Sequence, residues 1–139
     1  MMLSILLIGA SCKKSVSYSD TGSWTMGSAT YTSDNPSVVV NTSYGVTNNS
    51  LTFPLSSGAK LVLNFKGTYP TTYYLQSSSY YQDSQGNIYY GSSSTSTINI
   101  TSYDMVNSVP VLSGTFNFKG YSNTSSVELT NGKFDKVTN

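Results

Sequence analysis

Residues 60–66 read KLVLNFK, and this stretch decides which class of fold we expect. Leu61, Leu63 and Phe65 alternate with residues that are mostly polar, and successive side chains of a β-strand point to opposite faces. The stretch therefore predicts a strand with one apolar face and one mostly polar face. Such strands are typical of an antiparallel sheet that covers a core on one side only.

The same period of two recurs in both directions along the chain. Apolar residues alternate with polar ones in three further stretches, around Ile98 and Ile100, around Phe116 and Phe118, and around Val127 and Leu129. Residues 24–26 and 29–31 flank Gly27-Ser28, a pair that suits a tight hairpin. We also expect turns at residues 45–49 and at Asn131-Gly132, where turn-forming residues gather.

Many short alternating strands, joined by turns and without a segment of helical period, predict an all-β fold. The arrangement that we expect is an antiparallel two-layer β-sandwich, with a small β-barrel as the alternative. The 139 residues suffice for one domain with a hydrophobic core.

The charge of the chain excludes several functions. Only 9% of the residues are charged, the net charge is +1, and the sequence contains neither arginine nor histidine. A nucleic-acid-binding protein would need a basic stripe, so we expect no nucleic-acid partner. Histidine is the commonest general base and metal ligand, and its absence argues against a metal site. We expect no metal and no cofactor.

The chain opens with MMLSILLIGASCKK, in which residues 3–10 are almost entirely apolar. A membrane-spanning helix needs about 20 apolar residues, so this run is too short to span a bilayer. An apolar run followed by small residues is the pattern of a secretory signal. Cys12, the only cysteine, comes directly after those small residues.

This opening resembles a bacterial lipoprotein of the Gram-negative outer-membrane type, in which two small residues precede a lipidated cysteine. Ala10-Ser11-Cys12 followed by Lys13-Lys14 carries the resemblance, although Gly9 stands where that motif usually has leucine. The resemblance implies that residues 1–11 are a signal peptide, that the thiol of Cys12 is lipidated, and that residues 12–22 form a tether. Residues 23–139 then form a single β domain. It also implies a location at the outer membrane or cell surface.

The C-terminal half carries a second resemblance. Residues 97–104 read TINITSYD, and residues 112–135 read LSGTFNFKGYSNTSSVELTNGKFD. These runs resemble a family of small bacterial lipoprotein domains of unknown function, with an Ile-x-Ile-Thr strand, a Ser-Gly-Thr-Phe-x-Phe strand and a closing Thr-x-Gly-x-Phe. The match extends from Thr95 to the end of the chain. It implies the fold and the surface location, and it implies no activity.

Residues 73–92 read YYLQSSSYYQDSQGNIYYGS and contain three Tyr-Tyr pairs. Residues 83–87 have the pattern of a hairpin tip, a three-residue loop with Gly86 in the left-handed conformation. This register places Tyr81 opposite Tyr89 and Tyr80 opposite Tyr90. One cross-strand pair then faces the core and the other faces solvent.

These tyrosines are the candidate ligand-binding residues. Tyr74, Tyr103 and whichever pair faces outward would form an aromatic platform that stacks on sugar rings, while their hydroxyl groups bond to sugar hydroxyls. The candidate set is Tyr74, Tyr80, Tyr81, Tyr89, Tyr90 and Tyr103. The alternative is that the tyrosines only supply bulk to a sheet that is poor in charge.

No catalytic constellation is visible, and we expect a protein that is not an enzyme. The six carboxylates are scattered, so a hydrolase would need a pair such as Asp104 and Glu128 to meet across a cleft. We expect Asp83 to stabilise its turn rather than to bind calcium. The expected function is a structural or accessory role with an envelope protein partner, on a domain held at the membrane through Cys12. The alternative is a module that binds a polysaccharide.

Overall fold

The computed structural model describes residues 20–139, so Cys12 and the expected signal peptide lie outside the described residues. These residues form eleven strands. The strands are β1 (Thr21–Met26), β2 (Ala29–Ser33), β3 (Ser37–Ser43), β4 (Val46–Pro54), β5 (Lys60–Lys66), β6 (Thr72–Tyr74), β7 (Tyr80–Gln82), β8 (Ile88–Gly91), β9 (Thr97–Val106), β10 (Val109–Tyr121) and β11 (Ser126–Thr138). Within this part of the chain, nothing helical has the length and apolar character needed to cross a bilayer.

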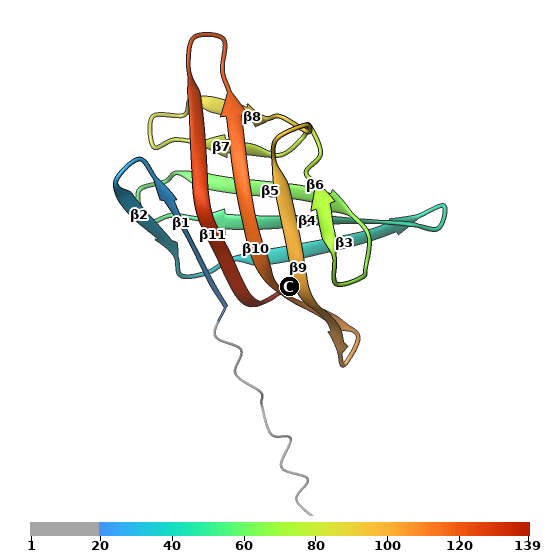
Figure 1. The fold of residues 1–139 in the computed structure, drawn as a ribbon. Coiled ribbons are helices and arrows are strands. Elements are labelled where there is room, and N and C mark those ends of the chain that lie inside the picture. The colour runs from blue at the N-terminus through green and yellow to red at the C-terminus, as the bar shows by residue number, and fades with distance from the viewer. Residues whose placement is uncertain (1–19) are drawn as a thin grey trace, which may run out of the picture.

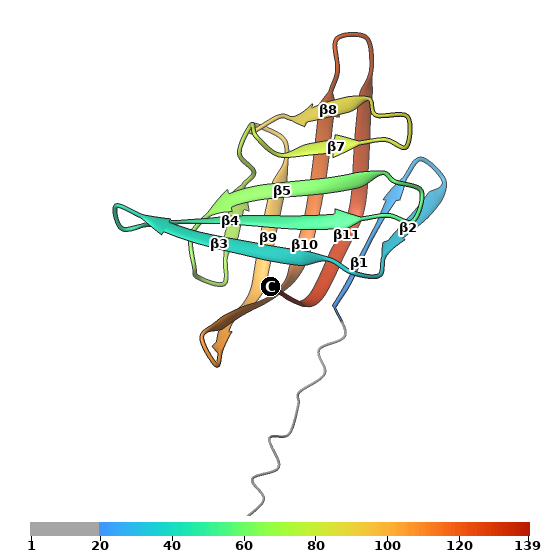
Figure 2. The same ribbon diagram turned by 180° about the vertical axis from the view of Figure 1, so that it is seen from behind.

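The strands lie in two layers that cross one another (Figures 1 and 2). One layer contains β6, β9, β10, β11, β1 and β2, and the other contains β8, β7, β5, β4 and β3. All strand pairs are antiparallel. The long strand β10 joins the layers, because it pairs with β9 over residues 109–117 and with β8 at residues 120 and 121. The expected all-β, two-layer antiparallel fold is confirmed.

The core lies between the two layers. Leu61, Leu63 and Phe65 of the KLVLNFK stretch are fully buried, as the alternation predicts. Their neighbours in the core come from both layers: Trp24, Val38, Leu51, Phe53, Leu75, Tyr81, Ile98, Ile100, Leu112, Phe116, Phe118, Leu129, Phe134 and Val137. Phe53 of β4 meets Phe116 of β10, with ring centroids 5.7 Å apart, so aromatic rings from the two layers interlock.

Two expected turn positions differ from the structure. Residues 131 and 132 lie inside the unbroken strand β11, where Phe118 pairs with Leu129 and Phe116 pairs with Gly132. Because β11 has one more residue than β10 over this interval, the Asn-Gly pair marks a β-bulge rather than a turn. Asn131 takes a φ of 52° there. A Cβ on residue 132 would lie 2.5 Å from the ring of Phe116, so the close approach of that ring requires glycine.

The second difference lies in the hairpin of β3 and β4. Strand β4 already begins at Val46, so most of the expected turn at residues 45–49 is strand. The turn itself is Tyr44-Gly45, with φ angles of 50° and 76°. Two successive positive φ angles are the mark of a type I′ turn.

At the N-terminal side, the hairpin at Gly27-Ser28 forms as expected, with Met26 paired to Ala29. Strand β1 begins at Thr21 rather than at residue 23, because Thr21 and Gly22 pair with Asp135 and Phe134 of β11. The first two residues of β1 therefore belong to the sheet, although the sequence placed them in the tether.

Candidate functional site

The β7–β8 hairpin has the predicted register. Tyr81 pairs with Tyr89 and Tyr80 pairs with Tyr90, with ring centroids 6.2 and 6.3 Å apart. Tyr81 is 4% exposed, whereas Tyr90 is 56% exposed. The inward pair is therefore Tyr81 with Tyr89, and the outward pair is Tyr80 with Tyr90.

Asp83 stabilises the tip of this hairpin, as expected. Its carboxylate accepts hydrogen bonds from the backbone N–H groups of Gln85 and Asn87, both at 2.9 Å, and from the side-chain amide of Asn87 at 2.8 Å. Gly86 has a φ of 89°, which completes the three-residue loop. The hydrogen bonds, above all the one from the Asn87 side chain, hold the pKa of Asp83 below its ordinary value.

We expect the Asp83→Asn variant to be less stable than the wild type at about pH 7, and the difference to close in acid. A depressed pKa in the folded state contributes stability above the unfolded value of about 4, and that stability is lost as the pH falls through the folded value. Urea unfolding of both proteins from about pH 7 to about pH 2 measures the difference. Asp34→Asn, at an exposed loop position, is the control substitution and should change the free energy of unfolding at about pH 7 by no more than about 0.5 kcal/mol. A gap that stays constant with pH would contradict this role of Asp83.

The outward tyrosines belong to a longer row that crosses four strands. Tyr80 pairs with Val62 of β5, Tyr90 pairs with Tyr80, and Tyr121 of β10 pairs with Tyr90. Directly paired residues share a face of the sheet, so the three tyrosine side chains project from the outer face of neighbouring strands. We call Tyr80, Tyr90 and Tyr121 the tyrosine row. Tyr121 is 45% exposed.

A lysine lies at each end of the tyrosine row. The Nζ atom of Lys60 is 5.5 Å from the ring centroid of Tyr80, and that of Lys119 is 5.9 Å from the ring centroid of Tyr121. Both distances are within the range of cation–π attraction. The outer surface thus combines aromatic rings with cationic groups at its two ends.

A shallow polar pocket of about 300 Å³ continues the line between β8 and β10 beyond Tyr90 and Tyr121. Its lining residues are Asn87, Ile88, Tyr89, Ser122, Asn123, Thr124 and Ser125. Amide and hydroxyl groups predominate there, and they can donate to and accept from a ligand that carries many hydroxyl groups.

Two tyrosines of the expected platform lie elsewhere. Strict alternation from Ile98 and Ile100 would turn Tyr103 outward, but β9 contains a bulge at Thr101, between the pairs Gly114–Ile100 and Ser113–Ser102. The bulge reverses the alternation. Tyr103 therefore packs against the core and donates a hydrogen bond of 2.9 Å to Oδ1 of Asn49, and burial raises its pKa.

Tyr74 is 69% exposed, but it lies on β6, in the layer that does not contain Tyr80 and Tyr90. It pairs with Thr97 of β9, which in turn pairs with Asn117 of β10. That position on β10 is four residues from Tyr121, about 13 Å along a strand. Tyr74 is therefore outside the tyrosine row.

Sequence reasoning missed Tyr121. Its outward direction could have been found from the alternation of Phe116 and Phe118, which continues through Lys119 to Tyr121. That Tyr121 lies next to Tyr90 could not be found from the sequence, because the β8–β10 pairing consists of only two residue pairs, which are 29 and 31 positions apart.

The carboxylates of the hydrolase hypothesis do not meet. Asp104 pairs with Val111 and Glu128 pairs with Lys119, eight residues further along β10. This separation is about 26 Å along a strand, whereas glycosidase carboxyl groups lie about 5–9.5 Å apart. Asp104 instead lines a pocket of about 630 Å³ with Asp135. Each of these carboxylates accepts a hydrogen bond from a serine, Ser102 and Ser113 respectively.

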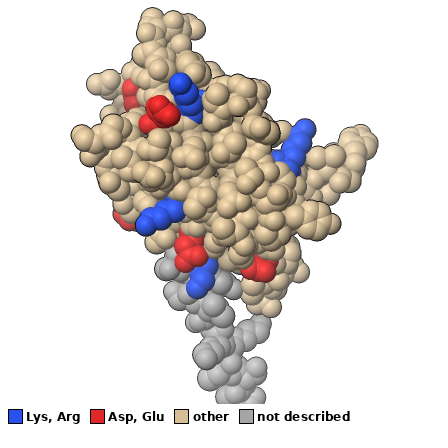
Figure 3. Space-filling view, in the orientation of Figure 1, with Lys and Arg blue, Asp and Glu red and all other residues tan. Residues whose placement is uncertain are grey.

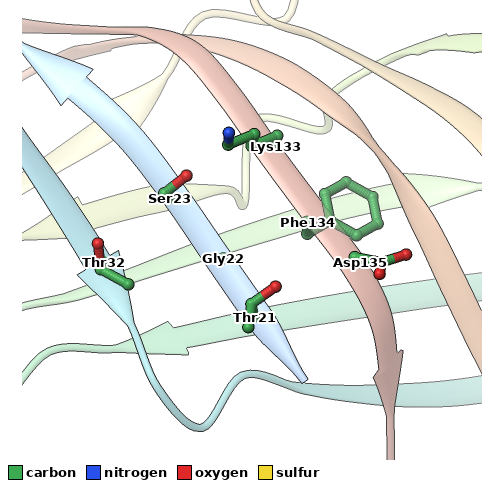
Figure 4. Close-up of a pocket in the computed structure, with 7 residues that line it drawn as sticks. All are labelled: Thr21, Gly22, Ser23, Thr32, Lys133, Phe134 and Asp135. Carbon is green, nitrogen blue, oxygen red and sulfur yellow. The ribbon is translucent and has the colours of Figure 1, made fainter. Parts of the chain in front are cut away.

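A further groove of about 420 Å³ crosses β2, β1 and β11 (Figure 4). Its lining includes hydroxyl groups of Thr21, Ser23 and Thr32, together with Lys133 and Asp135. Ser23 and Lys133 are cross-strand neighbours. A lysine that activates a serine must be desolvated, and Lys133 is exposed. The groove offers hydrogen-bonding groups rather than an activated nucleophile.

Charged side chains are sparse on the face shown in Figure 3, where wide neutral areas separate the few lysines and acids. That face shows no continuous basic patch of the kind that binds a phosphate backbone. In residues 20–139 no three potential metal-ligating side chains gather into one site.

Comparison with known proteins places the chain in a family. A family model described as "Domain of unknown function (DUF6252)" matches residues 20–138, which includes the whole sheet from β1 to β11. The match extends well beyond the C-terminal part that carried the resemblance in the sequence. No curated protein and no solved structure matched the chain. This protein therefore belongs to the DUF6252 family of domains of unknown function.

Proposed function

We propose that this protein is a non-catalytic binding domain, anchored by a lipid on Cys12 at the outer membrane or cell surface, and that its ligand is a glycan. The anchor rests on the sequence of the first fourteen residues. A diacylglycerol together with an amide-linked acyl chain supplies more than one hydrocarbon anchor, which is the condition for stable membrane residence.

The observation that carries the glycan proposal is the tyrosine row. Three neighbouring strands present one tyrosine each to the same face, at the strand spacing of about 4.8 Å. Aromatic rings bury the apolar face of a sugar, and tyrosine hydroxyls at their rim bond to sugar hydroxyls. The polar pocket at Asn87 and Asn123 adds amides at one side of the row.

The outer face around the row fits the same ligand. Asn41 of β3, Asn48 of β4 and Asn64 of β5 lie on this face. On each of these strands the alternate residues point into the core. The Nδ2 atom of Asn64 donates to the carbonyl oxygen of Ser78 at 3.0 Å, which leaves its Oδ1 atom for other partners. Amides of this kind bond to hydroxyl groups without adding charge.

An accessory role with a protein partner is the second candidate, and the edge strand β3 supports it. Strand β3 ends the strand order of its layer, and its outward Val39 is 58% exposed. An edge strand offers unpaired backbone groups to a partner strand. In this case the edge of β3, rather than the tyrosine row, would be the binding surface.

Affinity electrophoresis of the full chain, purified in detergent, against a panel of polysaccharides tests the proposal. We expect Tyr90→Ala and Tyr121→Ala each to weaken glycan binding about tenfold, because each removes one stacked ring. Tyr74→Ala is the matched control, since it deletes a tyrosine outside the row that is even more exposed than Tyr90 and Tyr121. The Cys12→Ser variant should no longer be found in the membrane fraction of the cells, but it should bind glycans like the wild type.

Two results would count against glycan binding. If the variants of the tyrosine row bound glycans as well as Tyr74→Ala does, the tyrosine row would have no role in binding. If no polysaccharide retarded the wild type, cross-linking in whole cells would decide for the protein partner. In that case a Val39→Lys substitution on the β3 edge should remove the cross-linked partner, whereas the row variants should keep it.

A further inference from the structure

The two lysines of β5 give one layer of the protein an unbalanced charge. Lys60 and Lys66 both lie on the outer face, because Leu61, Leu63 and Phe65 between them fill the core. The strands β3, β4, β5, β7 and β8 contain no aspartate or glutamate. The carboxylates of the described chain lie in loops, before β1, or on β9 and β11 of the other layer. The charged side chains on these five strands are therefore both lysines. Of the carboxylates in the adjoining loops, that of Asp83 is taken up by hydrogen bonds from Gln85 and Asn87.

A pocket of about 410 Å³ lies beside the second of these lysines, where β5 ends. Its lining includes Val46, Thr47, Lys66, Thr68 and Tyr69. The pocket thus combines an exposed aromatic ring, two threonines and one cation, and it contains no carboxylate. Tyr69 is 75% exposed, so its ring is open to a ligand at the edge of the pocket.

The loop that carries Tyr69 is held in place from both sides. The hydroxyl of Tyr73 donates to the carbonyl oxygen of Tyr69 at 2.8 Å and accepts from its N–H at 3.0 Å. Gly67 donates to the carbonyl oxygen of Thr47 at 3.0 Å, and its own carbonyl accepts from Nδ2 of Asn49 at 2.8 Å. Asn49 is buried and is itself fixed by the hydroxyl of Tyr103. An exposed ring on a loop fixed in this way loses little entropy when it binds a ligand.

The tyrosine row and this pocket lie at the two ends of one track along β5. Tyr80 stands beside Val62 with Lys60 over its ring, while Lys66 borders the pocket. Lys60 and Lys66 are six residues apart, or about 20 Å along a strand. Between them, Asn64 is half-buried on the outer face, and Val62, although it lies on the same face, is covered by its neighbours to 8% exposure. A ligand that uses both ends must be an extended chain rather than a single sugar.

We infer that the ligand is an extended acidic glycan, a chain of sugars that carry carboxylates. Its rings stack on the tyrosine row at one end and on Tyr69 at the other, and its carboxylates pair with Lys60 and Lys66. This inference rests on the proposed glycan-binding function and deepens it. It assigns a second subsite to a pocket in which the sequence indicated no ligand-binding residue.

Two matched polymers test the inference, polygalacturonate and the same polymer after reduction of its carboxyl groups to alcohols. The full chain in detergent should bind the acidic polymer more tightly, and added salt should remove that preference because exposed charges are screened. Tyr69→Ala should weaken binding of polygalacturonate about tenfold. Lys66→Gln should weaken it about threefold and leave the neutral polymer unaffected. Lys133→Gln, on the outer face of the other layer, is the control and should bind both polymers like the wild type.

The outcomes separate this inference from the function on which it rests. If the wild type binds both polymers equally and Lys66→Gln changes neither affinity, the inference that the ligand is acidic is overturned. If Tyr90→Ala still weakens binding of both polymers in that case, the proposed glycan binding stands. Normal affinity of Tyr69→Ala for polygalacturonate overturns the second subsite. If neither polymer nor any other polysaccharide binds, the proposed function and the inference fall together.

Discussion

Replacing Phe53 with alanine should lower the free energy of unfolding by about 3–5 kcal/mol, the range for deletion of a buried aromatic ring. Phe53 belongs to β4, and its ring contacts three aromatic rings of the other layer. The centroids of Trp24, Phe116 and Phe134 lie 6.1, 5.7 and 6.0 Å from that of Phe53. The cavity would therefore open between the layers, where neither layer can fill it by moving alone. The free energy of unfolding of a domain of this size is about 5–15 kcal/mol in total, so the variant would lose a large part of its stability.

Urea unfolding followed by circular dichroism measures this loss. Phe53→Leu is the matched control, because it keeps most of the volume and should cost about 1–1.5 kcal/mol. A loss of less than about 1 kcal/mol for the alanine variant would show that the layers do not depend on this aromatic cluster.

The Gly114→Ala variant should lose about 3 kcal/mol, because a methyl group at this position meets backbone rather than a movable side chain. Its Cβ would lie 2.3 Å from the carbonyl oxygen of Asn99 in β9 and 2.8 Å from the ring of Phe134. Residue 114 also borders the β9 bulge, where the register with β10 shifts. To make room, β9 must move away from β10 and lose ladder hydrogen bonds.

Two further variants isolate the cause of this loss. Thr115→Ala changes the exposed neighbour on the same strand and should cost no more than about 1 kcal/mol. Adding Phe134→Leu to Gly114→Ala should not restore stability, because the carbonyl of Asn99 remains in place. Recovery of wild-type stability in that double variant would identify the ring, and not the strand backbone, as the obstacle.

The candidate site could be predicted only in part. Local signals gave the β7–β8 hairpin, its register and the division of its tyrosines between core and solvent, because Asp83, Gly86 and the alternation all act within one hairpin. The predictions for the two other members of the expected platform, Tyr74 and Tyr103, were wrong for different reasons. Tyr103 points inward because the β9 bulge at Thr101 reverses the alternation. Tyr74 lies on β6, away from Tyr80 and Tyr90 and four residues along β10 from the position of Tyr121.

The sequence by itself determined the all-β class, the apolar face of each main strand, and the short-range turns at Gly27 and Gly86. These features depend on side-chain period and on the φ angle of single residues, which are local properties. Only the tertiary structure decided that Tyr121 completes the tyrosine row, that Asn131-Gly132 is a bulge, and that Tyr69 borders a pocket. The reason is that each depends on pairing or contact between residues distant in sequence. The hydrophobic core, not local propensity, selects those pairings.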